Sequence, residues 1–141
     1  MDPTERARRC AQAMYDADTA SQRLGVEISD VGPGRATAAM TITADMVNGH
    51  GICHGGYVFI LADTAFAFAC NTYDDRTVAA GADVTFLEPV RAGDALVAVA
   101  VERARRGRSG LYDVRVTRAD GTAVAEFRGR SRSLGRPMLE A

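Results

Sequence analysis

The stretch from Asn48 to Asn71 holds the residue types and spacings that could do chemistry. A polar, glycine-broken loop leads into fourteen residues, Tyr57 to Cys70, in which Asp63 is the one charged side chain. An ionised carboxylate among apolar neighbours is costly unless it is paired or lies near water. Burial also makes it a stronger base, which suits activation of a water molecule or direct attack on a carbonyl. This pattern predicts a buried helix that carries a reactive carboxylate.

The start of that helix, at Gly55-Gly56, is the second feature that could do chemistry. The first N–H groups of a helix have no partner within the helix, and the positive end of its dipole favours negative charge there. Glycine also lets a ligand approach the backbone closely. We therefore expect a site that stabilises a developing oxyanion at Gly55.

The spacing between these two features has a consequence for assembly. Gly55 and Asp63 are eight positions apart, which corresponds to about 12 Å along a helix. An attacking group and an oxyanion donor must both lie within about 3 Å of one reacting carbonyl. One helix cannot supply both groups, so we expect a dimer whose twofold axis creates two shared sites.

Other interpretations of the same stretch remain open. Asp63 could be a structural carboxylate, Asn48 could only stabilise a turn, and His54 could cap the helix or lie in the core. Cys53 beside His54 could act as a thiol nucleophile, although neighbours in sequence seldom face each other productively. His50, Cys53 and His54 could bind a metal, but the loop has no second cluster of ligands. We expect no metal.

The remaining segments must position this stretch. A helix is expected over about residues 4–23, with Thr4 as its N-cap. Six segments have the composition or alternation of strands and are bounded by turn residues: Val26–Val31, Arg35–Thr43, Thr77–Leu87, Ala95–Arg103, Leu111–Arg118 and Thr122–Arg132. The tail from Leu134 is expected to be loose. We predict an α+β fold in which an antiparallel sheet of five to six strands wraps around one long central helix, with an extra N-terminal helix.

Length and composition suit a single domain. The chain has 141 residues, of which 47% are hydrophobic and 25% charged, so we expect one domain over 1–141 with its core at about 24–135. The net charge of −1 argues against nucleic-acid or membrane-surface binding. The N-terminus lacks the apolar segment of a signal peptide, which predicts a cytoplasmic protein with reduced cysteines.

Three motifs together resemble a known family. Asn48-Gly49-His50, His54-Gly55-Gly56 and the run Leu61–Ala67 are similar to the hotdog-fold acyl-CoA thioesterases of the phenylacetic acid degradation type. Three further segments match the strands and turn that follow in that family: Phe86-Leu87-Glu88-Pro89, Ala92-Gly93-Asp94 and Phe127-Arg128-Gly129-Arg130. The likeness covers residues 24–135.

The resemblance implies a hotdog fold and a role for each site residue. Asp63 would be the catalytic base or nucleophile, and the Gly55 amide would polarise the thioester carbonyl. Asn48 and His54 would orient the thioester or water, with these groups coming from opposite subunits of a dimer or homotetramer. Coenzyme A would be part of the substrate, so no cofactor is expected.

A further set of residues is expected to bind the substrate. Guanidinium groups bind phosphates in bidentate fashion, so the arginine-rich turn could meet the nucleotide of coenzyme A, or it could be a solvated turn. The predicted substrate-binding residues are Gly56, Thr64, Arg105, Gly107, Arg108 and Ser109.

The leading functional hypothesis is hydrolysis of a small acyl-CoA thioester, such as a phenylacetyl or hydroxyphenylacetyl thioester. A hotdog hydratase or dehydratase is the first alternative, with His54 and Asp63 converging on a C–H bond. A non-catalytic acyl-CoA binding or sensing module is the second.

Overall fold

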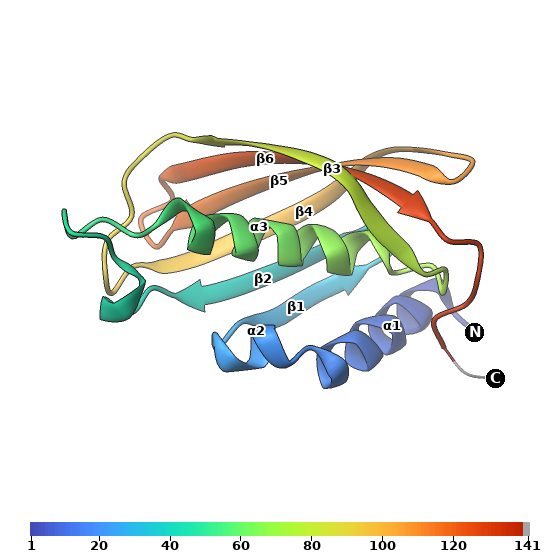
Figure 1. Cartoon of the computed structure of the whole chain (residues 1–141). Coiled ribbons are helices and arrows are strands. Elements are labelled where there is room, and N and C mark those ends of the chain that lie inside the picture. The colour runs from blue at the N-terminus through green and yellow to red at the C-terminus, as the bar shows by residue number, and fades with distance from the viewer. Residues whose placement is uncertain (140–141) are drawn as a thin grey trace.

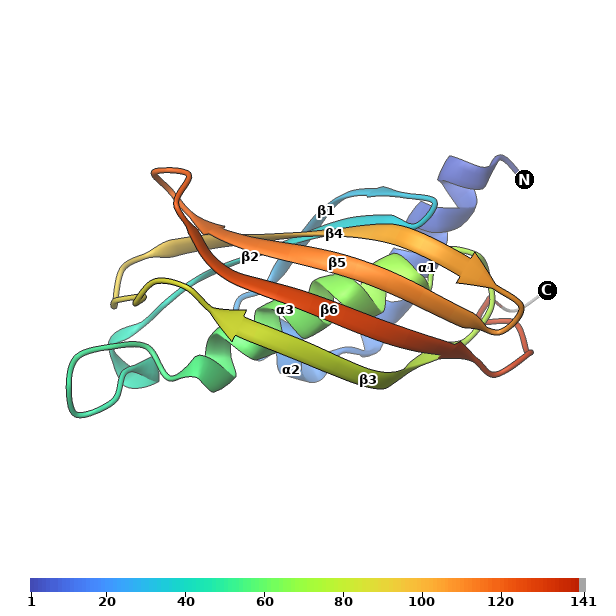
Figure 2. The ribbon, with the colours of Figure 1, turned by 90° about the horizontal axis from the view of Figure 1, so that it is seen from above.

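One six-stranded antiparallel sheet packs against a single long helix in the computed structural model, which describes residues 1–139 (Figures 1 and 2). This arrangement confirms the predicted α+β class. The helix, α3, spans Gly55–Cys70 and follows a short 3-10 turn at Ala44–Met46. The strands are β1 Glu27–Gly32, β2 Arg35–Thr41, β3 Thr77–Phe86, β4 Ala95–Arg106, β5 Ser109–Arg118 and β6 Ala123–Ser133.

The strand order across the sheet differs from the order along the chain. It runs β1-β2-β4-β5-β6-β3, and every neighbouring pair is antiparallel. The strands β2 and β3 flank α3 in the sequence but lie far apart in the sheet, so the helix is the crossover that carries the chain to the far edge. As a result, β3 is an edge strand, and β6 is the one strand of residues 1–139 with which it pairs.

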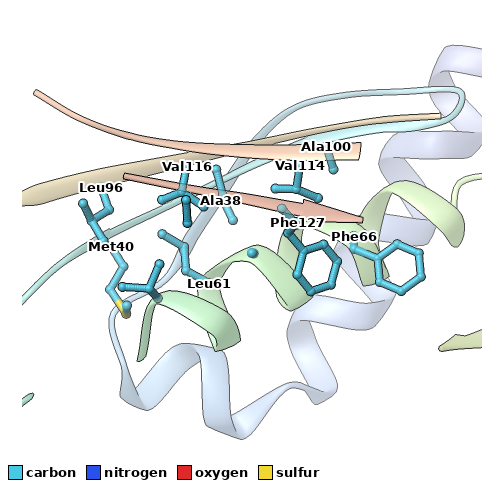
Figure 3. Close-up of a cluster of buried hydrophobic side chains, with 14 of the residues drawn as sticks. Ala38, Met40, Leu61, Phe66, Leu96, Ala100, Val114, Val116 and Phe127 are labelled. Carbon is cyan, nitrogen blue, oxygen red and sulfur yellow. The ribbon is translucent and has the colours of Figure 1, made fainter. Parts of the chain in front are cut away.

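The core lies between the inner face of the sheet and α3 (Figure 3). Strand β4 shows the pattern clearly: Leu96, Ala98 and Ala100 are buried, whereas the alternate valines 97, 99 and 101 are exposed. The small inward side chains let the helix approach the sheet closely. Phe66 fills the remaining space against Tyr112 and Phe127, with ring centroids 5.6 and 5.8 Å apart.

The N-terminal helix is divided in two, where the sequence predicted one continuous helix. Helix α1 spans Pro3–Ala17 and α2 spans Thr19–Arg23. The predicted N-cap at Thr4 is wrong, because the Asp2 carboxylate accepts hydrogen bonds from the N–H groups of Thr4 and Glu5, both at 3.1 Å. Asp18 makes the break, since its side chain accepts from the Ser21 N–H and caps α2. A carboxylate at an N-cap satisfies donors that the helix itself cannot.

The central helix is not enclosed on every side. It begins at Gly55, two residues before the apolar run at Tyr57, and most of its surface is buried. One face remains partly exposed and carries Gly56, Phe59, Ile60, Asp63 and Ala67. These five residues, which we call the exposed strip of α3, recur at three- and four-residue spacing and so lie on one side of the helix.

The C-terminal tail is docked as far as residue 139, where the sequence predicted a loose segment. The Leu134 N–H donates to the Arg76 carbonyl at 2.7 Å, and the Arg76 N–H donates to the Arg136 carbonyl at 2.8 Å. The Asp74 carboxylate then accepts from the N–H groups of Met138 and Leu139. Among the helices of residues 1–139, none has the length and apolar character that a membrane span requires.

Candidate active site

The loop before α3 is held in shape by Asn48. Its side-chain oxygen accepts from the N–H groups of His50 and Ile52, at 2.9 and 3.2 Å, and its own N–H donates to the Ile52 carbonyl at 2.8 Å. These contacts agree with the interpretation that Asn48 stabilises a turn. The same contacts fix where the chain enters the helix, so Asn48 positions the residues that follow.

His54 is the last residue before the helix. Its backbone N–H donates to the Met46 carbonyl at 2.9 Å, which joins the end of the loop to the 3-10 turn. Its imidazole makes no capping hydrogen bond and is exposed. The side chain therefore neither caps the helix nor lies in the core, and it can reach a ligand at the helix start.

Gly55 and Gly56 form the first turn of α3. Within the described part of the chain, neither backbone N–H has a hydrogen-bond acceptor, whereas the Tyr57 N–H already donates to the His54 carbonyl at 3.0 Å. Two free N–H groups at the positive end of a sixteen-residue helix are suited to an oxyanion. Both N–H groups are available as donors at the helix start, and the oxyanion role of Gly55 stays a prediction.

Phe86, at the end of β3, lies directly on Gly55. A side-chain carbon added at Gly55 would be only 2.8 Å from Cζ of the Phe86 ring, so glycine is required for this close approach. Phe86 is nevertheless 51% exposed. The sequence motif around Phe86 predicted a strand segment and no role in the site. The feature that could have pointed to such a role was a large aromatic residue at the end of a strand.

Asp63 lies at the middle of the exposed strip of α3 and is half-buried. Burial is the one cause that raises the pKa of its carboxyl group above the ordinary value, and no donor or cation of residues 1–139 opposes that shift. A carboxylate without a partner on a partly exposed face is unusual for a structural role. It is the arrangement expected of a base that meets its substrate from outside the chain.

Thr64, by contrast, is committed to the helix itself. It is buried, and its hydroxyl donates to the Ile60 carbonyl at 2.6 Å. This back-bond occupies the hydroxyl hydrogen and points the side chain into the fold. The structure therefore gives no support to its predicted contact with substrate.

The thiol and metal interpretations gain no support from the geometry. Cys53 is buried, and its Sγ donates to the His54 carbonyl at 3.3 Å. Burial, and then the charge of Asp94, raises the pKa of the Cys53 thiol, which opposes formation of the reactive thiolate. Across residues 1–139, no three His, Cys, Asp or Glu side chains gather closely enough to hold a metal ion.

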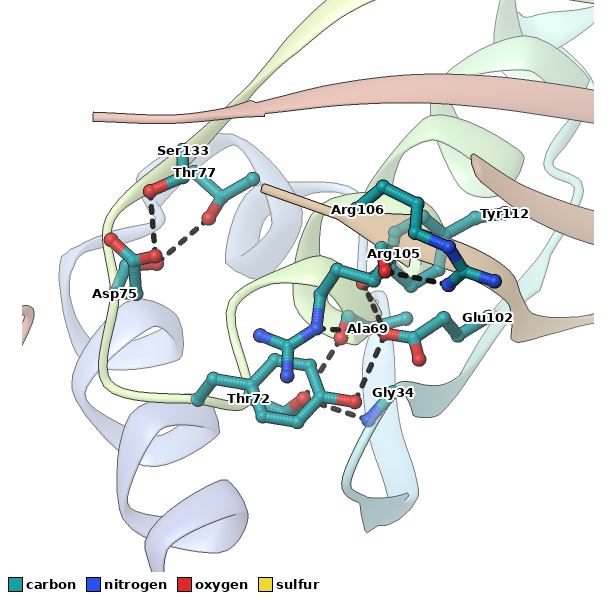
Figure 4. A network of polar contacts seen from close by, with 11 residues as sticks. Gly34, Ala69, Thr72, Asp75, Thr77, Glu102, Arg105, Arg106, Tyr112 and Ser133 are labelled. Atoms are coloured by element: carbon teal, nitrogen blue, oxygen red, sulfur yellow. Dashed lines mark hydrogen bonds and ion pairs between the residues drawn. The ribbon is translucent and has the colours of Figure 1, made fainter. Parts of the chain in front are cut away.

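Arg105 is already engaged by neighbours (Figure 4). Its guanidinium carbon lies 3.6 Å from the centre of the Tyr73 ring, and its Nε is 3.8 Å from the Glu102 carboxylate. The same Glu102 oxygen accepts hydrogen bonds from the hydroxyls of Tyr73 and Tyr112, each at 2.9 Å. Burial, and then the contact with Glu102, raises the pKa of Tyr112. This network joins the sheet to the segment that follows α3.

The rest of the predicted nucleotide-binding turn lies at the same end of the molecule. Arg106 pairs with Ser109 across a two-residue turn, and Gly107 has a φ of +57°, which favours glycine. Arg108 packs beside Gly135 in the docked tail. This end of the sheet borders Cys70 and Asp75, at the end of α3 opposite Gly55. Sixteen helical residues separate the two ends by about 24 Å.

A single chain therefore does not assemble all predicted site residues. Asn48, His54, Gly55 and Gly56 meet at the start of α3, Asp63 lies about 12 Å further along it, and the arginine turn lies beyond its other end.

Comparison with known proteins links this geometry to one group of enzymes. The family model described as "Thioesterase superfamily" matches residues 50–125. The acyl-coenzyme A thioesterase PaaI of Escherichia coli strain K12 is 42% identical to this chain over 132 residues, which are 94% of each chain.

Solved structures show the same likeness. The E. coli PaaI protein from the phenylacetic acid degradation operon superposes with a TM-score of 0.95 at 40% identity, covering 98% of this chain and all of that one. A mutant of the phenylacetic acid degradation protein PaaI from Thermus thermophilus has a TM-score of 0.79 at 36% identity, covering 83% of this chain and all of that one.

Proposed function

The chain belongs to the thioesterase superfamily and has its hotdog fold, and from this premise we propose that it hydrolyses a small acyl-CoA thioester through Asp63. One solved relative comes from a phenylacetic acid degradation operon and another is named a phenylacetic acid degradation protein, which favours a phenylacetyl or hydroxyphenylacetyl thioester. Water and the thioester give a carboxylic acid and free coenzyme A.

The observation that carries this proposal is the carboxylate of Asp63 on the exposed strip of α3, which has no partner among residues 1–139. Burial disfavours its ionised form and so raises its basicity. As a base it would take a proton from the attacking water, and as a nucleophile it would attack the thioester carbonyl itself. Both routes place negative charge on the carbonyl oxygen, and the free N–H of Gly55 is suited to receive it.

The site requires two chains, because Gly55 and Asp63 of one helix lie about 12 Å apart. Strand β3 supports a specific arrangement, since it is a ten-residue edge strand with exposed Val78 and Phe86. An uncovered edge of this length is a template for pairing with another chain. Two copies of β3 would pair about a twofold axis, cover the exposed strip, and bring each Asp63 to its partner's helix start. Two such dimers would make the homotetramer.

Coenzyme A would then extend away from the shared site over the protein surface. The turn at 107–109 and Arg105 are proposed to meet its phosphates, and His54 and Asn48 to orient the thioester. Arg105 would meet the phosphates either from its present position on the Tyr73 ring or after leaving that ring.

Release of free thiol from phenylacetyl-CoA tests the reaction directly. The wild-type protein should hydrolyse this substrate, and Asp63→Asn should abolish turnover because the amide can neither accept the proton nor attack. Wild-type protein that releases no thiol from any acyl-CoA would end the proposal. Hydration of an enoyl-CoA, followed by its absorbance, would instead favour the hydratase alternative.

Mixing two inactive variants tests the shared site. Asp63→Ala and Gly55→Pro chains should each lack activity, but about half of the dimers in an equal, exchanged mixture contain both, and each of these has one intact site. The mixture should recover about 25% of wild-type activity by this symmetry argument. No recovery in heterodimers shown to have formed would contradict sharing.

A further inference from the structure

A cavity of about 400 Å³ opens beside Gly55. Its walls come from the loop before α3, the start of α3, the end of β3 with the loop that follows it, and the beginning of β6. The lining residues used below are Gly55, Val58, Phe86, Leu87, Val90 and Val124. Glu88, which is exposed, is its one charged lining residue.

The floor of this cavity is rigid. Val58, Val90 and Val124 are all nearly inaccessible to solvent. Backbone hydrogen bonds join the segments, since the Leu87 N–H donates to the Val124 carbonyl at 2.8 Å and the Cys53 N–H donates to the Val90 carbonyl at 2.7 Å. These two hydrogen bonds tie the segments of the floor together.

The rim is different, because Phe86 and Leu87 are about half exposed. The Phe86 ring lies on Gly55 and can rotate about its own side-chain bonds without disturbing the core. Phe86 and Gly55 therefore line the cavity side by side.

A thioester whose carbonyl meets the Gly55 N–H places one of its two arms in this cavity. The pantetheine arm contains amides, which are costly to bury against the valine, leucine and phenylalanine side chains that make up most of the lining. An apolar acyl group meets no such cost, and pockets for small ligands are predominantly apolar. An engineered apolar cavity of about 150 Å³ binds benzene, so the space here is ample for a phenyl ring.

We propose that this cavity holds the acyl group of the substrate and that Phe86 and Leu87 at its rim set the acyl size that the enzyme accepts. This inference rests on the proposed thioesterase activity and deepens it.

The test measures the ratio of kcat/KM for phenylacetyl-CoA to kcat/KM for the smallest acyl-CoA that the protein hydrolyses. Val58→Phe fills the cavity from its floor, and Leu87→Phe narrows it at the exposed rim with little risk to folding. Either change should lower the ratio about tenfold or more, since one methylene in a pocket is worth about 10- to 200-fold. Thermal unfolding and elution volume confirm that each variant folds and assembles as the wild type does.

Leu134→Phe is the matched control, because Leu134 is 41% exposed in the tail, outside the residues that line the cavity. Its ratio should equal that of the wild type. If the folded cavity variants keep the wild-type ratio, whether or not their activity on both substrates falls, the cavity does not hold the acyl group and the inference is overturned. If the wild-type protein is inactive on every acyl-CoA, the thioesterase proposal itself is overturned, and this inference falls with it because it rests on that activity.

Discussion

Replacing Gly55 with proline would remove the one N–H that we assign to the oxyanion while keeping the helix. Gly55 is the first residue of α3, the position where proline is best tolerated. The preceding residue, His54, has a ψ of 133°, which already lies in the range that proline imposes on its predecessor. The change therefore deletes a donor without demanding a new backbone conformation.

Gly55→Ala is the matched control, since it keeps the N–H and shares the added side-chain carbon. That carbon would lie 2.8 Å from the Phe86 ring in both variants, and the exposed ring can rotate away. Loss of one oxyanion donor typically costs about 10²- to 10³-fold in kcat, or about 2.7–4 kcal/mol. We expect the kcat of Gly55→Pro to be about 10²-fold or more below that of Gly55→Ala.

The assay is release of free thiol from phenylacetyl-CoA at saturating substrate. Circular dichroism and elution volume should show that both variants keep the fold and the assembly of the wild type. If the folded proline and alanine variants have the same kcat, the Gly55 amide is not the oxyanion donor. The reasoning from the helix start would then be refuted.

Three further predictions concern the site carboxylate and the core. Because burial raises the pKa of Asp63, kcat/KM should fall as the pH is lowered through a midpoint above the ordinary aspartate value of about 3.9; a midpoint at or below that value would contradict the dominance of burial. Tyr112→Phe should lower the free energy of unfolding by about 1–2 kcal/mol in urea, because it removes a buried hydrogen bond to the charged Glu102, and an unchanged midpoint would count against the network. Gly129→Ala should cost about 1–3 kcal/mol, since the added carbon would lie 2.7 Å from the buried Phe66 ring, and unaltered thermal unfolding would show that the core can yield there.

The folded elements nearest the site could be predicted because their signals are local. The run from Tyr57 to Cys70 is apolar at nearly every position, and the glycines before it mark where the helix begins. The strand segments alternate, and their turns carry glycine. The break between α1 and α2 was missed because Asp18 acts through its side-chain contact with Ser21, which apolar spacing does not report.

The arrangement at the far end of α3 was also beyond local signals. Arg105 was predicted because guanidinium groups bind phosphates in bidentate fashion, but its guanidinium stacks on Tyr73, a residue from another segment. Thr64 was predicted from its hydroxyl, which instead bonds to the Ile60 carbonyl. In both cases a side chain with suitable chemistry has a partner that only the folded chain brings within reach.

The sequence by itself determined the helix start at Gly55, the single charge at Asp63 and the distance between them, because helical rise follows directly from residue number. Only the tertiary structure decided that β3 crosses to the edge of the sheet, that Phe86 comes to lie on Gly55, and that the face of α3 carrying Asp63 stays partly open. Strand order is set by contacts between segments far apart in the chain, and hydrophobic periodicity carries no information about which strands become neighbours.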